Sequence, residues 1–179
     1  GDGAAGGFDL RPVGAAVYGT SGRIEKGYRL MGAELDGEYS PVEAGLARPK
    51  VKADDFVGKQ AYLAARAAGP AARLCVLAAD SLACAEGYDR FPAGAGNEPI
   101  LTAAGERIVD SHGRVSRVTT AGNAPSVGRY LMMGYLPTEL CEVGSQFSVM
   151  YQNELYPATL AATGANLALF DPDDSRMKG

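Results

Sequence analysis

The feature that most constrains this fold is the change of sequence pattern at Pro70. After it, the chain consists of short β-rich runs separated by glycine, proline and asparagine. The predicted strands are Arg73–Ala79, Pro99–Thr102, Glu106–Asp110, Arg114–Thr120, Val127–Leu136, Gln146–Gln152 and Leu155–Ala162. Short strands at this spacing are typical of a small antiparallel barrel or sandwich. Residues 111–113 (Ser-His-Gly) are predicted to form a hairpin turn, and Ala93–Asn97 and residues 122–125 are predicted to form loops.

Before Pro70 the pattern is helical. Residues 59–68 read KQAYLAARAA, and Gly69-Pro70 is a strong helix stop. Asp54 or Asp55 is expected to cap the N-terminal end of this helix. Three apolar side chains are expected to face the core, namely Phe56, Leu63 and Ala67.

Residues 23–58 form a charged stretch in which both signs alternate with glycines and tyrosines. If residues 23–30 are extended, Arg23, Glu25 and Arg29 share one face. If they are helical, Glu25 and Arg29 form an ion pair four residues apart. Both alternatives remain open from the sequence. The composition of the stretch indicates a binding site for a polar, partly planar ligand.

Composition excludes some classes of partner. The chain has 179 residues, is 46% hydrophobic and carries a formal net charge of −4. Nucleic acids and anionic membrane surfaces recruit clustered basic residues, so we expect neither as a partner. No apolar run approaches the roughly 20 residues that a membrane-spanning helix needs. Cys75, Cys84 and Cys141 match no metal or disulfide spacing, and we expect reduced thiols in a cytoplasmic protein.

Several apparent motifs carry no chemistry. The spacing of Gly1, Gly3 and Gly6 formally fits a dinucleotide-binding loop, but no strand precedes it. His112, the single histidine, is expected to lie exposed in a turn. The terminal aspartates lack the rest of a calcium-ligand pattern and are expected to form a solvated tail; they are Asp171, Asp173 and Asp174.

Three ordered motifs resemble a known family. They are RIEKGYRLMGAELD at residues 23–36, SPVEAGL at 40–46 and DFVGK at 55–59. They are similar to the glycine cleavage T-protein (aminomethyltransferase) superfamily, and more closely to the folate-binding region of dimethylglycine and sarcosine dehydrogenases. Later segments are similar as well: NEPIL at 97–101, SVGR at 126–129, MGYLP at 133–137 and LFDP at 169–172.

The resemblance implies an α+β fold in two parts. Residues 1–70 would be the C-terminal segment of the family's folate-binding core, and residues 71–179 an antiparallel, jelly-roll-like β-barrel domain. The remainder of the core would come from an N-terminal part of the parent chain, which the resemblance makes a partner of this chain.

The resemblance also implies an activity. Members transfer a one-carbon unit from a methylated amine to tetrahydrofolate, and in the fused enzymes an upstream domain carries FAD and oxidises the amine first. The family's catalytic aspartate belongs to the N-terminal half, so no catalytic residue is assigned here and this chain alone is expected to be inactive. A non-enzymatic binding or regulatory domain of the same fold is the alternative.

The family pattern implies three residues that contact the folate cofactor. Arg23 stands where the family has an arginine associated with folate binding, and a guanidinium suits an anionic glutamyl tail. Glu25 could contact the ligand, orient Arg23, or pair with Lys26 or Arg29. Tyr28 could stack on the ligand or pack against the protein.

Overall fold

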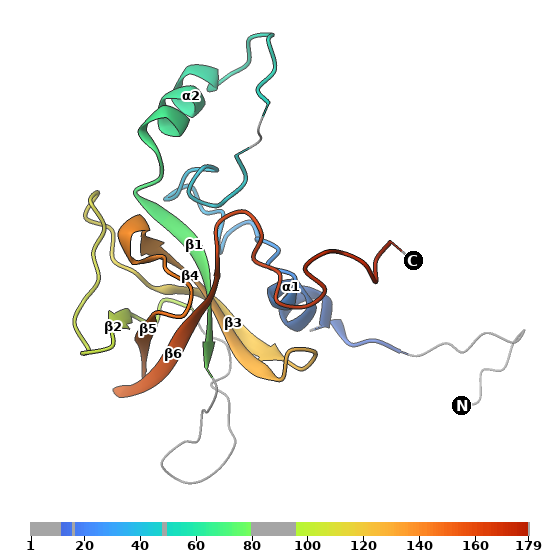
Figure 1. The fold of residues 1–179 in the computed structure, drawn as a ribbon, viewed down its shortest axis with the longest axis vertical. Coiled ribbons are helices and arrows are strands. Elements are labelled where there is room, and N and C mark those ends of the chain that lie inside the picture. Colours follow the sequence, from blue (N-terminus) through green and yellow to red (C-terminus); the bar gives the residue numbers. More distant parts are fainter. Residues whose placement is uncertain (1–11, 16, 48–49, 80–95, 179) are drawn as a thin grey trace, which may run out of the picture.

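The computed structural model describes residues 12–15, 17–47, 50–79 and 96–178. A π-helical turn, Val17–Ser21, leads into a short helix, α1 (Gly22–Glu25), and a ten-residue helix, α2 (Lys59–Ala68), follows the charged stretch. A 3₁₀ turn, η2 (Thr138–Leu140), follows β4. The strands are β1 (Ala72–Ala79), β2 (Ile100–Thr102), β3 (Val118–Ala124), β4 (Arg129–Pro137), β5 (Gln146–Tyr151) and β6 (Glu154–Thr163). Figure 1 shows the strands gathered below α2, with α1 beside β3.

The six strands form one antiparallel sheet in the order β2-β5-β6-β1-β4-β3. Its two ends meet, because the Ile100 N–H donates to the Ser116 carbonyl and the Val118 N–H to the Glu98 carbonyl. These bonds join the segments that flank β2 and β3. The sheet therefore curls into a barrel, which pairs strand edges that would otherwise be exposed.

Both faces of β1 are buried, which explains its continuous apolar sequence. Cys75, Leu77 and Ala79 point into the barrel core, together with side chains such as Ile100 and Phe147. The alternate residues of β1 lie on the outer face, in a second cluster that is built from Leu74, Val76, Ala78, Leu131, Met133, Tyr135, Ile24, Tyr39, Ala44 and Leu167. Residues 24–44 therefore share a core with the outer face of β1 and β4.

Most of the predicted strands are confirmed, but in the described chain the predicted strand Glu106–Asp110 is absent, and both ends of β3 differ from the prediction. The segments 106–110 and 114–117 contribute only isolated bridges, such as Val109 to Val115. The predicted loop at 122–125 is largely strand, because β3 continues to Ala124 and the turn lies at residues 125–128. Gly122 fits within β3 because its bare Cα faces the π-helical turn and α1, where an added Cβ would lie 2.8 Å from Thr20 and 3.3 Å from Ile24. Pairing with β4 thus overrides the local turn signal.

The predicted loop at Ala93–Asn97 lies mostly outside the described residues, as do Cys84 and Gly1–Gly6.

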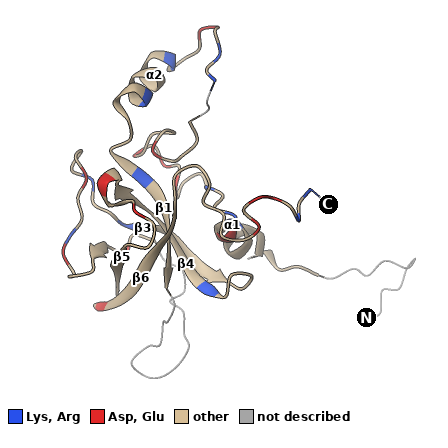
Figure 2. Cartoon of the chain, in the orientation of Figure 1, with Lys and Arg blue, Asp and Glu red and all other residues tan. Residues whose placement is uncertain are grey.

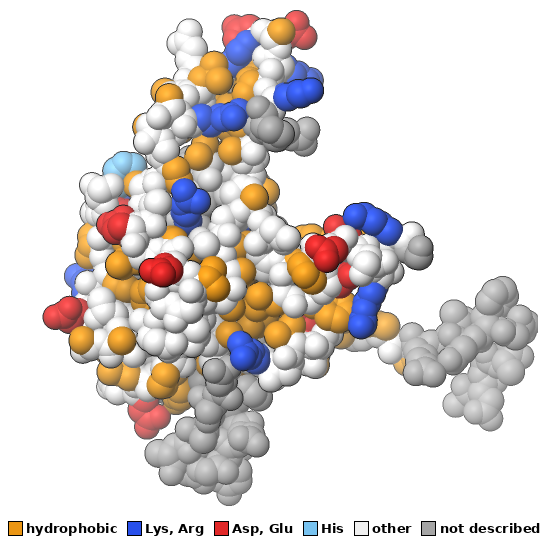
Figure 3. Space-filling model, in the orientation of Figure 1, with side chains coloured by type: hydrophobic (Ala, Val, Ile, Leu, Met, Phe, Trp, Pro, Cys, Tyr) orange, Lys and Arg blue, Asp and Glu red, His pale blue; other side chains and the backbone are white. Residues whose placement is uncertain are grey.

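The helix at residues 59–68 is confirmed, but its predicted cap and orientation were wrong. Its N-cap is Gly58, in the left-handed conformation, rather than Asp54 or Asp55. None of its side chains is buried, and Leu63 is exposed. Phe56 and Ala67 are exposed as well. Figure 1 shows the helix standing apart from the barrel, and Figure 3 shows orange apolar side chains at the surface of this projecting part. The helical period is right, but within the described chain no core covers its apolar face.

The segment after α1 is neither a continued helix nor a strand. Helix α1 ends at Glu25, and Gly27 follows at φ 65°, where an added Cβ would lie 2.4 Å from the Cβ of Leu167. Only glycine allows the chain to turn so close to that residue. In the described chain, residues 23–30 thus adopt neither of the two predicted conformations. Figure 2 shows basic (blue) and acidic (red) residues spread along the chain between α1 and α2.

Candidate functional site

Arg23 is held inside the protein by α1. Its side chain is 9% exposed. The guanidinium donates to the Gly19 carbonyl (3.1 Å), the Tyr28 carbonyl (3.0 Å), the Glu34 carboxylate (2.9 Å) and the Thr120 hydroxyl (3.1 Å). These contacts use most of the hydrogen-bonding capacity of an arginine. Arg23 therefore connects α1, the following turn and β3.

Glu34 is the buried counter-ion of Arg23. It has no exposed surface, and one carboxylate oxygen also accepts from the Leu30 N–H at 2.9 Å. The other oxygen accepts from the Thr119 hydroxyl at 2.7 Å and the Thr120 hydroxyl at 2.5 Å. Such a set of donors replaces the hydrogen bonds to water that a carboxylate loses on burial. The positive charge of Arg23 is thus largely neutralised within the protein.

Glu25 lies apart from this ion pair. Its carboxylate accepts from the Ser126 N–H at 2.7 Å, and its carbonyl accepts from the N–H groups of Leu169 and Phe170 at 2.9 and 3.1 Å. Arg29, its predicted partner, donates instead to backbone carbonyls, including that of Gly164 at 2.9 Å. Glu25 therefore ties α1 to the β3–β4 turn and to the C-terminal segment.

Tyr28 is the most accessible of the three predicted residues. Its side chain is 51% exposed, and its hydroxyl lies 3.9 Å from the sulfur of Met177. It lines a pocket of about 370 Å³, together with Tyr18, Arg23 and Leu30. A ligand in this pocket could reach the ring of Tyr28 but would find Arg23 already engaged.

Two further pockets lie along the charged stretch and share Leu46. One, of about 660 Å³, is lined by Met31, Leu35 and Tyr39, among others. The other, of about 480 Å³, is lined by Phe56 and Tyr62 on the α2 side. Leu46, the last residue of the SPVEAGL motif, is exposed and lines both pockets.

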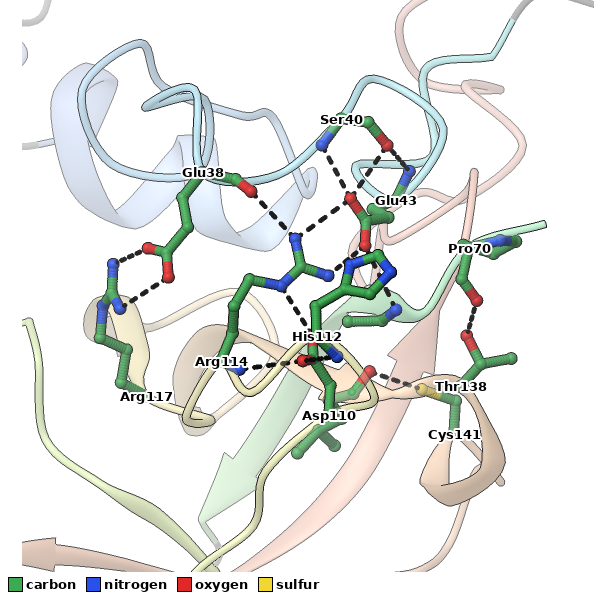
Figure 4. Close-up of polar contacts among 12 residues, drawn as sticks. Glu38, Ser40, Glu43, Pro70, Asp110, His112, Arg114, Arg117, Thr138 and Cys141 are labelled. Carbon is green, nitrogen blue, oxygen red and sulfur yellow. Dashed lines mark hydrogen bonds and ion pairs between the residues drawn. The ribbon is translucent and has the colours of Figure 1, made fainter. Parts of the chain in front are cut away.

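Arg114 forms the second centre of charge, shown in Figure 4. It forms ion pairs with Asp110 (2.7 Å) and with Glu43, and donates to the Glu38 carbonyl at 2.9 Å. Its guanidinium lies 4.2 Å from the centre of the Tyr39 ring. Arg114 therefore holds residues 38–43 against the hairpin at 110–114.

This centre shifts the pKa values of its carboxylates. Burial acts to raise the pKa of Glu43, but hydrogen bonds from Arg114 and Ser40 outweigh it and lower that pKa below its ordinary value. Burial opposes the shift of Asp110 too, and hydrogen bonds from Arg114 and from the His112 N–H lower its pKa. Both carboxylates are thus stabilised in their charged forms. They serve the structure rather than proton transfer.

The C-terminal segment returns to α1. Lys26 forms an ion pair with Asp174 at 2.6 Å and donates to the Asp171 carbonyl at 2.8 Å. The prediction of a solvated tail was therefore wrong for Asp171, whose side chain is 3% exposed. His112 is exposed in its turn, as predicted. The described residues contain no cluster of three or more metal-ligating side chains, and none of the helices described is both long and apolar enough to cross a membrane.

Comparison with known proteins gives the family. Residues 92–164 match the model of the glycine cleavage T-protein C-terminal barrel domain. Dimethylglycine dehydrogenase of Rattus norvegicus is 33% identical over 160 residues, which cover 87% of this chain and 16% of that protein. A probable aminomethyltransferase of Natronomonas pharaonis is 31% identical over 158 residues, 87% of this chain and 39% of that protein. The chain belongs to the glycine cleavage T-protein superfamily. It spans well under half the length of these T-protein relatives.

A solved T-protein structure supports the fold. The aminomethyltransferase of the Bartonella henselae glycine cleavage system superposes with a TM-score of 0.63, at 22% identity, over 78% of this chain and 36% of that one. The structural likeness extends beyond the residues that the T-protein barrel model matches. The barrel closed between β2 and β3 is therefore the T-protein C-terminal barrel.

Sequence reasoning missed the two ion-pair centres within the T-protein motifs. Glu34 and Glu43 lie in the charged stretch at residues 23–58, and the composition of that stretch does not indicate their ion-pair partners. The local signal for Glu43 was Ser40-x-x-Glu43, a capping box in which Ser40 Oγ lies 3.3 Å from the Glu43 N–H and Glu43 accepts from the Ser40 N–H at 2.9 Å. Arg114 gave no such signal, because it lies 71 residues further along the chain.

Proposed function

We propose that this chain is the C-terminal part of a tetrahydrofolate-dependent aminomethyltransferase-type protein. In its parent it would be fused to a flavin-dependent dehydrogenase of the dimethylglycine or sarcosine type, and the one-carbon unit would pass from a methylated amine to tetrahydrofolate. The motifs at residues 23–59 and the similarity to both a dimethylglycine dehydrogenase and an aminomethyltransferase support this assignment.

The observation that carries the proposal is the half-exposed ring of Tyr28, which lines the pocket shared with Tyr18, Arg23 and Leu30. A volume of about 370 Å³ lies within the usual range of small-molecule sites. Folate contains planar rings, and an exposed tyrosine offers an aromatic face for stacking. Because Arg23 binds the Tyr28 carbonyl, the arginine fixes the backbone that presents this ring.

Tetrahydrofolate fits these residues in one respect and not in another. The aromatic face of Tyr28 suits the cofactor, whereas Arg23 is paired with Glu34 and does not suit the anionic glutamyl tail. When bound, the cofactor supplies the nitrogen atoms that accept the one-carbon unit. This chain supplies one rigid wall of the site, in which Arg23 and Glu25 position the segment and Tyr28 contacts the ligand.

The rest of the site would come from the N-terminal remainder of the parent chain. The relatives are much longer than this chain. Helix α2 exposes Leu63, and the segment just before the helix exposes Phe56 and Val57. Apolar side chains gathered on a projecting helix suit a protein partner. We assign this remainder to the α2 surface, and with it the catalytic base. The FAD would belong to a domain further upstream.

Calorimetry with tetrahydrofolate tests the function on the longer parent chain and on this chain. We expect binding by the parent, and a weakening of about tenfold in the Tyr28→Ala variant, since one aromatic stacking contact contributes about 1–3 kcal/mol. The matched control is Tyr151→Ala in β5. Helix α1 contacts β3 and β4, which stand at the opposite end of the strand order from β5. If the parent binds no tetrahydrofolate, the enzymatic function is excluded.

A non-enzymatic T-protein-like domain is the second candidate. It is favoured by one observation: Arg23, which was predicted to bind the ligand, already donates four hydrogen bonds within the protein. A scaffold would bind no folate in the parent chain and would tolerate Tyr28→Ala without any change in the parent's activity. The same calorimetric titration therefore separates the two functions.

A further inference from the structure

Two cysteines that the proposed function does not use lie side by side in the barrel. The sulfur atoms of Cys75 and Cys141 are 3.6 Å apart, although the residues are separated by 66 positions in the sequence. Cys75 lies in β1 and is fully buried. Cys141 directly follows η2 and is partly exposed. The pair thus combines one accessible thiol with one that only its neighbour can reach.

Polar groups surround the pair. The Cys75 sulfur lies 3.4 Å from the Thr163 hydroxyl, and the Cys141 sulfur lies 3.3 Å from the Pro137 carbonyl. The Nε atom of Arg73 is buried and has no hydrogen-bond partner among the described residues. Such surroundings favour reactive cysteine chemistry, whereas a thiol in a purely apolar core is inert.

The charge distribution distinguishes the two thiols. The hydrogen bond from Cys75 lowers the pKa of Cys141; the Thr163 hydroxyl and the positive charge of Arg73 act in the same direction, against burial and the charge of Glu139. The hydrogen bond with Cys141 and burial raise the pKa of Cys75. The thiolate therefore forms at the more exposed sulfur, where an oxidant can reach it.

We propose that Cys75 and Cys141 form a dithiol that hydrogen peroxide converts to an intramolecular disulfide. The Cys141 thiolate attacks one peroxide oxygen, the O–O bond breaks, and Cys141 becomes a sulfenic acid as hydroxide leaves. The Cys75 sulfur then attacks the Cys141 sulfur, the S–O bond breaks, and the departing hydroxide takes the Cys75 proton as water. Two thiols lose two electrons, and the peroxide is reduced to two water molecules. A dithiol reductant reverses the reaction by exchange.

The disulfide would act on the base of α2. Thr138, the first residue of η2, donates from its N–H to the Ala71 carbonyl at 3.0 Å and from its hydroxyl to the Pro70 carbonyl at 2.5 Å. Figure 4 shows the bond to Pro70 beside Cys141. Oxidation would add a covalent bond between β1 and Cys141, the residue that directly follows η2. The segment between α2 and β1, which Thr138 already holds by hydrogen bonds, would then become more rigid. This consequence does not depend on folate binding.

The test uses the whole chain with Cys84→Ser, because Cys84 falls in the same tryptic peptide as Cys75. Hydrogen peroxide is expected to remove both remaining thiols, as measured with a thiol reagent, and to lower the intact mass by that of two hydrogen atoms. Peptide mapping without reductant should join the two cysteine peptides within one monomer. Dithiothreitol should restore both thiols, and the oxidised form should melt at a higher temperature.

Two variants in the same background assign the order of steps. With Cys75→Ala, Cys141 is expected to stop at the sulfenic acid, which dimedone traps. With Cys141→Ser, a partly exposed position that should still allow folding, the Cys75 thiol is expected to survive the same peroxide treatment. The proposal is overturned if both thiols persist in the folded Cys84→Ser chain, if they are lost only through links between chains, or if Cys75 is oxidised equally well without Cys141.

Discussion

The pair of Arg23 and Glu34 shows how a residue that suggests ligand binding can serve the fold. The guanidinium and the carboxylate satisfy each other at 2.9 Å, and Thr119 and Thr120 complete the carboxylate's hydrogen bonds. Burying either charge alone is costly, whereas the pair together is tolerated. The position of each charge is therefore set by the other.

Removal of Arg23 alone is expected to destabilise the protein strongly. The Arg23→Leu variant leaves the Glu34 carboxyl group buried without its counter-ion, and we expect a loss of about 3–5 kcal/mol in the free energy of unfolding. Urea unfolding followed by circular dichroism measures this loss. The exposed Arg107→Leu is the matched control and should change stability by less than about 0.5 kcal/mol. A double variant that also carries Glu34→Leu should regain part of the loss; equal stability of the single and double variants would contradict the pairing.

Arg114 is expected to make stability depend on acid. Because the pKa values of Glu43 and Asp110 are lowered in the folded state, their stabilisation is present above their ordinary values of 4.5 and 3.8 and is lost as pH falls through the lower, folded values. The free energy of unfolding should therefore fall below about pH 4.5. Urea unfolding of the Arg114→Met variant across pH 3–7 should give a flatter acid limb. An unchanged limb would show that other carboxylates cause the dependence.

At the scale of elements, glycines in the T-protein motifs allow close approach between segments. Gly45 has φ 71°, and an added Cβ would lie 2.3 Å from the Gly164 carbonyl oxygen and 2.9 Å from the Arg29 guanidinium. The same guanidinium donates to that carbonyl at 2.9 Å. Gly45 thus lets the SPVEAGL turn rest against the end of β6.

Substitution of Gly45 tests this approach. Gly45→Ala is expected to cost about 2–4 kcal/mol, which combines backbone strain with overpacking. The matched control is Gly37→Ala, with φ 90° but no heavy atom of the described residues within 4 Å of the added Cβ. It should cost only the backbone term of about 1–2 kcal/mol. Thermal unfolding of both variants measures the difference, and equal losses would show that the contact contributes nothing.

The sequence predicted the helices and strands better than the contacts between them. The β-rich run of β1 and the helix stop at Gly69-Pro70 are local signals, and both are confirmed. The burial of Leu63 was wrong, because a helical period shows which face is apolar but not what covers that face. The partners of Arg23 and Glu25 could not be predicted either, since Thr120 and Ser126 lie about a hundred residues away. The division at residue 70, the jelly-roll topology and the cytoplasmic location stay predictions.

At the scale of the whole molecule, α2 and the barrel differ in how they are stabilised. The barrel is closed by hydrogen bonds and filled by its own core, whereas α2 projects with exposed apolar residues. A projecting helix of ten residues is marginal on its own. The proposed parent chain would supply its missing contacts.

A negative charge introduced at the exposed apolar face of α2 is expected to lower stability only in the longer parent chain. Leu63→Glu should change the free energy of unfolding of this chain by less than about 0.5 kcal/mol, because the side chain is already exposed. In the parent, the same variant should cost about 1–3 kcal/mol, since it would bury a carboxylate. Thermal unfolding of both proteins measures the contrast. The exposed Gln60→Glu is the control within the same helix, and equal effects of Leu63→Glu in both proteins would argue against a docked remainder.

The position of β1 between β4 and β6 also bears on how the protein forms during synthesis. β1 precedes both of its partners in the chain, and its pairings reach from Ala72 to Pro137 and from Cys75 to Thr163. The segments at 106–124, by contrast, pair with neighbours close in sequence. As the ribosome extends the chain, β1 emerges well before either partner and must wait with its backbone unpaired. We expect barrel closure to be a late, all-or-none event that requires β6 to have left the ribosomal tunnel.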